Sequence, residues 1–390
     1  MKIIDTIKRA LASAGLDTQA APMPGVADTI QQALSAAGFN PRRPAAAPRA
    51  AVINAGARAT GTARVRADGA PIRPNVPAEP AGAGEFVSRE YRNEAGTRSY
   101  KLYLPAGYAA RLTDTAATAM PMVVMLHGCT QTPDDFAAGT RMNALADRYG
   151  FLVVYPEQTT HANGSKCWNW FRPGDQDRGR GEPSLIAGIT GEVASNYRVD
   201  ARRIYVAGLS AGAAMAVILG ATYPELYAAV GAHSGLPHGA AHDMPSAFGA
   251  MKSGGVGPVP GGLNPRAASK SPRRDGGQRM PTIVFHGDRD HTVHARNGDA
   301  IVAQATAGGA DELPLRASVH DGVAADGRSY RHTVYADADN RPIVEQWELH
   351  GAGHAWSGGS SDGSYTDVHG PDASAEMIRF FYAQPRAQHR

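Results

Sequence analysis

"RIYVAGLSAGAAMAVILGATYP", residues 203–224, joins two kinds of local sequence pattern. It begins with β-branched and aromatic residues that are typical of a buried strand. After Ser210 it continues as a run of small and apolar residues that favours a helix. Gly208 and Gly212 flank the serine at the junction. The stretch therefore predicts a tight strand-to-helix turn that presents one serine.

A serine hydroxyl is an effective nucleophile only when it is exposed, lies beside a base and faces donors for the oxyanion that it generates. The pattern G-x-S-x-G supplies the exposure, and it places the start of a helix under the developing charge. An ordinary glycine-rich turn is the alternative interpretation, but the strand before and the helix after favour a nucleophile elbow. We predict Ser210 as the nucleophile and the N–H of Ala211 as one oxyanion donor.

The rest of the chain favours an α/β fold. Apolar runs typical of buried strands lie at 121–128, 151–157, 203–208, 228–235, 282–287 and 344–351. Helical patterns fall between several of them, at 135–149, 184–197, 211–222 and 372–383. This alternation predicts a mostly parallel sheet with helices on both faces. The catalytic domain is predicted over 85–386, with a hairpin at its start and a Gly- and Pro-rich surface loop at 252–280.

The elbow predicts an acid and a histidine further along the chain, in that order. Asp290 follows the strand run at 282–287, and His354 follows the last strand run in a glycine-flanked loop. Asp288 is the rival acid. We expect His354 to take the Ser210 proton and return it to the leaving alcohol, while the acid orients the imidazole.

The second oxyanion donor is expected in the loop that begins His127-Gly128-Cys129-Thr130. Cys129 is the first choice and Thr130 the second, and Thr130 is also a candidate substrate contact. A Gly-dependent turn is a compatible interpretation of this loop. No metal and no cofactor is implied, because catalysis by a serine triad needs neither.

Six motifs in order support a family resemblance. They are "LHGCTQTPDDF" (126–136), "YPEQ" (155–158), "CWNWF" (167–171), "GLSAGAAM" (208–215), "HGDRDHTV" (286–293) and "GAGHAWSGG" (351–359). Over residues 90–385 the sequence resembles the polyhydroxybutyrate (PHB) depolymerase family of α/β-hydrolase esterases, which also contains feruloyl-esterase-like and acetylxylan-esterase-like members. The resemblance implies an α/β-hydrolase fold with Ser210, Asp290 and His354 as the triad.

The same resemblance implies that Cys129 and Cys167 lie close together beside the active site. They form either a disulfide or two buried thiols, and a reducing cytoplasm favours the thiols. Trp168, Trp170 and Trp356 belong to the shared motifs. Aromatic residues are more often core than ligand-binding, but a polyester of short methyl-branched units needs flat apolar subsites. We therefore expect at least one of the three to face the cleft.

The N-terminal segment differs in texture. "DTIKRALASAGLD" (5–17) returns as "DTIQQALSAAGFN" (28–40), which predicts two short amphipathic helices within 1–40. Residues 41–84 are rich in Ala, Pro and Arg and are predicted to be a disordered linker. No apolar run is long enough for a transmembrane helix, and the N-terminus lacks the apolar core of a secretory signal. These features resemble intracellular depolymerases that act on native polymer granules. We expect a cytoplasmic protein that contacts the granule surface through residues 1–84.

Three functions are compatible with the sequence. The first is hydrolysis of poly(3-hydroxybutyrate) or its oligomers through an acyl-enzyme. The second is a broader carboxylesterase activity on feruloyl, acetyl or other short-chain esters. The third is a granule-binding role of the N-terminal repeats. A nucleic-acid partner is not expected, because the arginines of the linker have no interleaved aromatic residues. The oligomeric state stays open.

Overall fold

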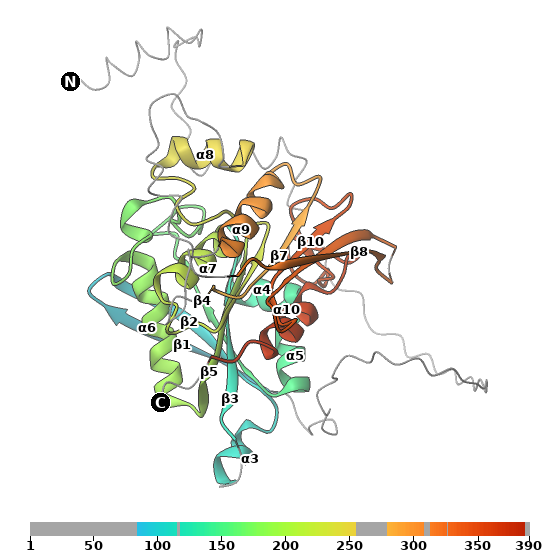
Figure 1. Ribbon diagram of the computed structural model, residues 1–390. Helices are drawn as coiled ribbons and strands as arrows, with labels where there is room; N and C mark the ends of the chain where they lie inside the picture. The colour runs from blue at the N-terminus through green and yellow to red at the C-terminus, as the bar shows by residue number, and fades with distance from the viewer. Residues whose placement is uncertain (1–83, 115–117, 255–278, 308–312, 326, 387–390) are drawn as a thin grey trace, which may run out of the picture. The chain divides into compact units, whose positions relative to one another are not determined.

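The computed structural model describes residues 84–114, 118–254, 279–307, 313–325 and 327–386. The repeats predicted within 1–40 lie outside the described residues, as do the predicted linker apart from Gly84 and most of the predicted loop at 252–280. The described residues form a large sheet with helices packed against it (Figure 1).

The main sheet has ten strands in the order β1-β2-β4-β3-β5-β6-β7-β10-β9-β8. The strands are β1 (Glu85–Asn93), β2 (Gly96–Leu104), β3 (Met120–Leu126), β4 (Leu152–Pro156), β5 (Val199–Leu209), β6 (Ala229–His233), β7 (Thr282–Gly287), β8 (Arg316–Val323), β9 (Ser329–Ala336) and β10 (Pro342–Leu349). The six central strands run parallel, and an antiparallel pair closes each end. The strands β3, β4, β6 and β7 are buried along their whole length, as expected for parallel strands that are covered on both faces.

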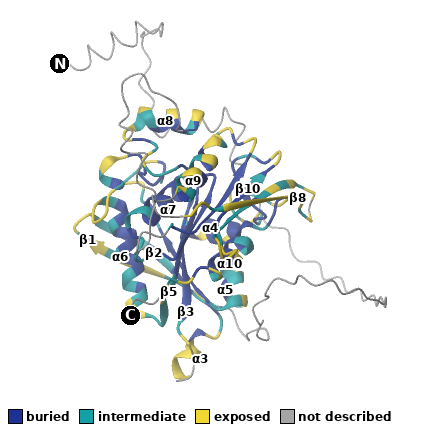
Figure 2. Cartoon of the chain, in the orientation of Figure 1, coloured by how far each residue is buried: buried dark blue, intermediate teal, exposed yellow. Residues whose placement is uncertain are grey.

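Helices cover both faces of the sheet, as predicted. They are α3 (Tyr108–Thr113), α4 (Pro133–Thr140), α5 (Met142–Tyr149), α6 (Gly181–Asn196), α7 (Ala211–Thr222), α8 (Met244–Ser253), α9 (Arg296–Thr306) and α10 (Ala373–Tyr382), with a 3-10 turn η1 (Pro173–Asp175). Helix α6 packs on α7, and α5 packs on α10. Figure 1 shows these two pairs on opposite sides of the sheet, and Figure 2 shows the buried residues concentrated in the strands between them.

The structure corrects one predicted helix and adds several elements. The pattern at 135–149 is two helices, α4 and α5, because Arg141 between them adopts the left-handed conformation with φ 54°. The Arg141 guanidinium donates to the Gly358 carbonyl at 2.7 Å, a contact that local sequence does not reveal. Helix α9 and the strands β8 and β9 were not predicted. Helix α8 extends two residues into the predicted loop.

The parallel strands bring distant segments to one edge of the sheet. The strands β3, β5, β7 and β10 end directly before the loop at 127–131, Ser210, the loop with Asp290 and the loop with His354. Because parallel strands share their carboxyl edge, these four segments lie side by side, as ligand-binding loops do in open α/β sheets. A two-stranded sheet follows His354, formed by β11 (Trp356–Ser357) and β12 (Thr366–Asp367).

Candidate active site

Ser210 occupies a strained position between the end of β5 and the start of α7. Its φ is 58° and its ψ is −120°, a combination that non-glycine residues rarely adopt. Such a conformation costs about 1–3 kcal/mol and persists only where the surroundings enforce it. Here the Ser210 N–H donates to the His233 carbonyl at 2.9 Å, and the Ser210 carbonyl accepts from Ala214 N–H at 3.0 Å. The elbow predicted from the sequence is therefore present.

The two glycines of the elbow are required by close backbone packing. A Cβ on Gly208 would lie 2.5 Å from the Gly212 backbone. A Cβ on Gly212 would lie 2.1 Å from the Leu126 carbonyl oxygen at the end of β3. Both distances are shorter than any tolerated carbon contact. Glycine at these positions thus lets the elbow rest directly on the strand that leads into the loop at 127–131.

The predicted acid and base are in contact. His354 Nδ1 donates to Asp290 Oδ2 at 2.7 Å, and both side chains are buried. Asp290 Oδ1 also accepts from the N–H groups of Thr292 and Val293, at 2.9 and 2.8 Å. Burial alone would raise the pKa of Asp290, but His354, together with hydrogen bonds from His286 and His354, holds that pKa well below its usual range. Asp290 is therefore a carboxylate that accepts the Nδ1 proton of His354.

Asp288, the rival acid, has different partners. Its carboxylate accepts from Gly351 N–H at 2.7 Å and lies 3.2 Å from His350 Nδ1. These contacts brace the start of the loop that carries His354. The geometry thus selects Asp290 over Asp288 as the partner of the imidazole.

Two further histidines lie in the site, and neither of them has a role predicted from the sequence. His286, in β7, has its Nε2 at 2.8 Å from the Val293 carbonyl and 3.4 Å from Asp290 Oδ2. His233, the last residue of β6, accepts from Ser357 N–H through Nε2 at 3.0 Å. Burial, followed by the neighbouring His286 and His354, lowers the pKa of His233 to about 3. Their signal in the sequence is their position at the ends of buried strands.

His233 also connects the Ser210 elbow to the loop that carries His354. Its carbonyl holds the Ser210 N–H, and its imidazole holds Ser357 N–H, three residues beyond His354. The neutral imidazole thus fixes the loop that follows His354 against the strand beside the elbow.

The loop after β3 is the candidate source of the second oxyanion donor. Thr130 has φ 66°, and its N–H donates to the Ser165 carbonyl at 2.7 Å. That bond removes Thr130 from the candidate donors and leaves Cys129. On the other side, Ala211 is the first residue of α7, so its N–H has no acceptor within the helix. The pair of oxyanion donors Cys129 and Ala211 stays a prediction.

Cys129 and Cys167 form a disulfide across 38 residues of sequence, with their Cα atoms 4.2 Å apart. The bond joins the loop after β3 to the "CWNWF" segment. Trp168 in that segment donates from its indole Nε1 to the His127 carbonyl at 3.1 Å. The segment thus holds the loop at 127–131, which we call the candidate oxyanion loop, from outside the sheet.

Removal of the disulfide is expected to destabilise the protein. Closing a loop of this length removes about 4 kcal/mol of chain entropy from the unfolded state in the loop-entropy estimate, and measured losses are commonly 2–5 kcal/mol. The double variant Cys129→Ala/Cys167→Ala should lower the urea midpoint accordingly, and addition of dithiothreitol to the wild type should reproduce the shift. An unchanged midpoint in both experiments would show that the bond does not contribute to stability.

The structure corrects the tryptophan predictions. Trp168 is 0% exposed and Trp356 is 1% exposed. Trp356 stacks on His233 with ring centroids 5.2 Å apart and donates its indole N–H to Ser374 Oγ. Both rings belong to the core and offer no surface to a substrate. Trp170 is 6% exposed, and Thr130 is exposed with its Oγ1 3.1 Å from the Tyr365 hydroxyl, so a substrate contact by these two stays a prediction.

Comparison with known proteins gives the family. Residues 98–309, more than half of the chain, match the family model described as Esterase PHB depolymerase. The chain belongs to this family. The match contains Ser210 and Asp290, and His354 lies beyond it.

The curated relatives of this PHB depolymerase family chain are enzymes of ester hydrolysis. Poly(3-hydroxyalkanoate) depolymerase C of Paucimonas lemoignei is 36% identical over 269 residues, which are 69% of this chain and 60% of that protein. Feruloyl esterase B of Neurospora crassa is 34% identical over 189 residues, covering 47% of this chain and 63% of that protein. This chain thus spans about 60% of the length of these two relatives.

A solved structure supports the fold of the family member. Acetyl xylan esterase from Aspergillus awamori aligns with 77% of this chain and 100% of that chain, with a TM-score of 0.54 and 20% identity. The described residues of the chain have the α/β-hydrolase fold, as the family resemblance implied.

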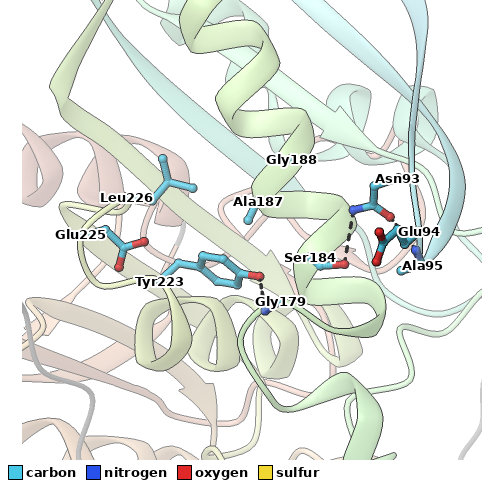
Figure 3. A pocket seen from close by; sticks show the side chains of 10 residues that line it. All are labelled: Asn93, Glu94, Ala95, Gly179, Ser184, Ala187, Gly188, Tyr223, Glu225 and Leu226. Carbon is cyan, nitrogen blue, oxygen red and sulfur yellow. Dashed lines mark hydrogen bonds between the residues drawn. The ribbon is translucent and has the colours of Figure 1, made fainter.

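A cavity of about 490 Å³ lies elsewhere on this esterase-family domain (Figure 3). Its walls come from the β1–β2 turn, the segment around the start of α6 and the chain after α7, including Asn93, Ser184 and Tyr223. Because Tyr223 follows the twelve-residue helix α7 that Ser210 precedes, the cavity lies about 18 Å from the elbow along that helix. None of Ser210, Asp290 and His354 lines it.

Two negative findings apply to the described part of this esterase-family chain. None of its helices is long and apolar enough to cross a membrane. It also contains no group of three or more His, Cys, Asp or Glu side chains that could hold a metal ion.

Proposed function

We propose that this protein is a carboxylic ester hydrolase that cleaves poly(3-hydroxybutyrate) or its oligomers through an acyl-enzyme on Ser210. One observation supports the chemistry above all others. The Asp290–His354 contact joins the loops after the neighbouring strands β7 and β10, and the Ser210 elbow follows β5, which only β6 separates from β7, at the same edge of the sheet. Membership of the Esterase PHB depolymerase family supports the substrate class.

In the proposed acylation step, His354 Nε2 accepts the Ser210 hydroxyl proton while Oγ attacks the ester carbonyl carbon. The carbonyl oxygen becomes an oxyanion that accepts hydrogen bonds from the N–H groups of Ala211 and Cys129. The tetrahedral intermediate collapses, the bond to the alkoxy oxygen breaks, and His354 gives its proton to this oxygen, which leaves as an alcohol. Asp290 holds the imidazolium by its Nδ1 proton.

Deacylation repeats these steps with water. His354 takes a proton from the water, the hydroxide attacks the acyl carbon, and Ser210 leaves as an alkoxide that recovers the proton from His354. The products are a carboxylic acid and an alcohol. For a poly(3-hydroxybutyrate) chain, both new ends are hydroxybutyrate units.

A broader carboxylesterase activity is the second candidate. It is favoured by the 34% identity to feruloyl esterase B of Neurospora crassa and by the 29% identity to a probable acetylxylan esterase A of Aspergillus fumigatus. The same triad would serve either substrate.

The deciding experiment compares substrates. Release of 3-hydroxybutyrate from amorphous polymer granules should be measured beside hydrolysis of p-nitrophenyl butyrate, methyl ferulate and acetylxylan. Polymer hydrolysis at rates comparable to those of the soluble ester supports the depolymerase. Cleavage of the small esters alone would replace the polymer assignment by the broader carboxylesterase.

We also propose that residues 1–84 bring the enzyme to the granule surface in the cytoplasm. These residues hold ten Lys and Arg against five Asp and Glu, so the segment is positively charged. A variant lacking residues 1–83 should keep its activity on p-nitrophenyl butyrate and sediment less with granules. Equal sedimentation would assign the segment another role.

The Cys129–Cys167 disulfide opposes the cytoplasmic part of this proposal, because disulfides are rare in reducing compartments. Reduced thiols in alkylated cell extracts would support the cytoplasmic location, and an intact disulfide there would overturn it.

A further inference from the structure

A buried carboxylate that the proposed mechanism does not use lies beside the active site. Glu182, at the start of α6, is 3% exposed. Its Oε1 accepts from the side-chain amides of Gln158 and Asn169, at 2.5 and 2.7 Å, and its Oε2 accepts from the Asn169 N–H at 2.7 Å. Arg98 Nη2 lies 3.4 Å from Oε1. A desolvated charge is costly, so a carboxylate with four donors is a strong anchor for the groups that it holds.

A first series of hydrogen bonds connects Glu182, through Gln158, to the candidate oxyanion loop. The Gln158 side chain is held by Glu182, and its own backbone N–H donates to His127 Nε2 at 3.1 Å. The opposite nitrogen, His127 Nδ1, donates to the Gly128 carbonyl at 2.7 Å. That carbonyl belongs to the peptide whose N–H is the Cys129 N–H, the proposed oxyanion donor. The orientation of this peptide therefore depends on His127.

His127 can serve this role only as a neutral imidazole. It accepts through Nε2 and donates through Nδ1, which fixes one tautomer. Burial lowers the pKa of His127 to about 4, so the ring stays neutral at the pH of ester hydrolysis. The neutral ring thus holds the Gly128–Cys129 peptide through its two hydrogen bonds and adds no charge to the site.

A second set of contacts connects Glu182 to the same loop through the "CWNWF" segment. Glu182 holds both the backbone and the side chain of Asn169, and Gln158 donates to the Cys167 carbonyl at 3.0 Å. Cys167 is joined to Cys129 by the disulfide. The same carboxylate therefore anchors the candidate oxyanion loop from two sides.

We propose that Glu182 is a positioning residue for ester hydrolysis, which sets the direction of the Cys129 N–H through Gln158 and His127 and through the disulfide-linked segment at 167–169. This inference rests on the proposed function, since it needs an oxyanion at that N–H. Glu182 itself does not touch the substrate.

The variant Glu182→Gln tests the proposal with little change of shape. A glutamine has one acceptor oxygen and one NH2 donor, so one of the facing donors loses its acceptor and meets another donor. We expect kcat for p-nitrophenyl butyrate to fall about 10- to 100-fold, less than the 10²- to 10³-fold loss seen when an oxyanion donor is deleted outright. KM should change by less than about twofold, because the ground-state carbonyl gains little from the oxyanion donors.

Glu345→Gln is the matched control. Glu345 is 1% exposed and accepts from His332 and Arg379, so the glutamine likewise places an amide in a buried carboxylate position, here with partly exposed donors. It lies in the middle of β10, four residues before the strand ends at Leu349, and both of these donors lie outside the loop that carries His354. Glu345→Gln should lower the melting temperature while its kcat stays within twofold of the wild type.

A transition-state analogue distinguishes misplaced oxyanion donors from a general loss of fold stability. A trifluoromethyl ketone forms a hemiketal oxyanion on the serine and so reports on the oxyanion donors. Its inhibition constant should rise in Glu182→Gln in step with the loss of kcat/KM and stay unchanged in Glu345→Gln. If Glu182→Gln does not fold, Gln158→Met, which removes the same amide link from its other end, should show the same pattern.

The outcomes distinguish this inference from the proposed function. Full kcat in folded Glu182→Gln, or equal losses of kcat in Glu182→Gln and Glu345→Gln, overturns the positioning role while ester hydrolysis by Ser210 stands. A wild-type enzyme with no ester activity, or with activity unaffected by Ser210→Ala, overturns the proposed function first.

Discussion

Replacement of Ser210 by alanine is expected to lower kcat for ester hydrolysis by about 10⁶-fold, the loss found when the nucleophile of a serine triad is removed. Alanine keeps the Cβ, and the only atom lost is the Oγ that attacks the ester. The backbone bonds of residue 210 to His233 and Ala214 involve main-chain atoms and persist in the variant. The melting temperature should therefore stay close to that of the wild type.

Two assays make this test specific. Turnover of p-nitrophenyl butyrate by the purified variant gives the rate, and labelling with diethyl p-nitrophenyl phosphate reports on the nucleophile itself. The wild type should take up one diethylphosphoryl group per chain and lose activity in proportion, whereas Ser210→Ala should take up none. Turnover within tenfold of the wild type, or a label on another serine, would remove Ser210 from the mechanism.

Replacement of Asp290 by asparagine should cost about 10⁴-fold in kcat, because an amide at this position favours the wrong tautomer of the histidine base. Asp290 Oδ2 accepts the Nδ1 proton of His354, and two backbone N–H groups hold the other oxygen. An asparagine in this geometry must present its NH2 either to His354 or to those N–H groups. The first choice favours the wrong tautomer of His354, and the second leaves the two backbone N–H groups facing a donor, which destabilises the loop that holds residue 290.

Asp288→Asn is the control for this prediction, because Asp288 lies two residues away and is bonded to Gly351 and His350. Its kcat should stay within about tenfold of the wild type, since its contacts only support the loop. Measurement of kcat and KM for both variants decides between the two carboxylates. A larger loss in Asp288→Asn would exchange their roles.

The low pKa of Asp290 also predicts an effect on stability. A carboxyl whose pKa is lower in the folded protein than in the unfolded chain stabilises the fold above its unfolded pKa, and this contribution is lost as the pH falls through the folded pKa. The wild type should thus exceed Asp290→Asn in urea stability at pH 7. The difference should shrink as the pH falls below about 4, the ordinary pKa of an aspartic acid.

The sequence predicted the elements whose signals are local. Helix α7 spans the predicted range. The strands β4, β6 and β7 fall within their predicted runs, and β3, β5 and β10 overlap theirs, because buried parallel strands are apolar on both faces. The hairpin β8–β9 escaped prediction for the opposite reason. Nearly all of β8 is exposed, and its eight residues hold no apolar run like those of the buried strands.

Where contacts between residues far apart in the chain determine a residue's role, the sequence alone left alternatives open. Asp290 was the predicted acid with Asp288 as its rival, and the hydrogen bond to His354 separates them. Thr130 was excluded as an oxyanion donor by a bond to Ser165, 35 residues away. Trp168 and Trp356 were misassigned because their indole N–H groups find acceptors inside the protein, which satisfies their polar atoms without solvent or ligand.

The antiparallel strands at the two ends of the sheet have a consequence for long substrates. Tyr100 of β2 pairs with Pro156 at the carboxyl end of β4, and Tyr330 of β9 pairs with Leu349 at the carboxyl end of β10. Both hairpin turns thus lie at the carboxyl edge of the sheet, and the β1–β2 turn also lines the cavity about 18 Å from the elbow. We expect a change in the length of either turn to alter the surface that a long substrate meets at an end of the sheet, while the parallel strands and the loops that carry the triad stay as they are.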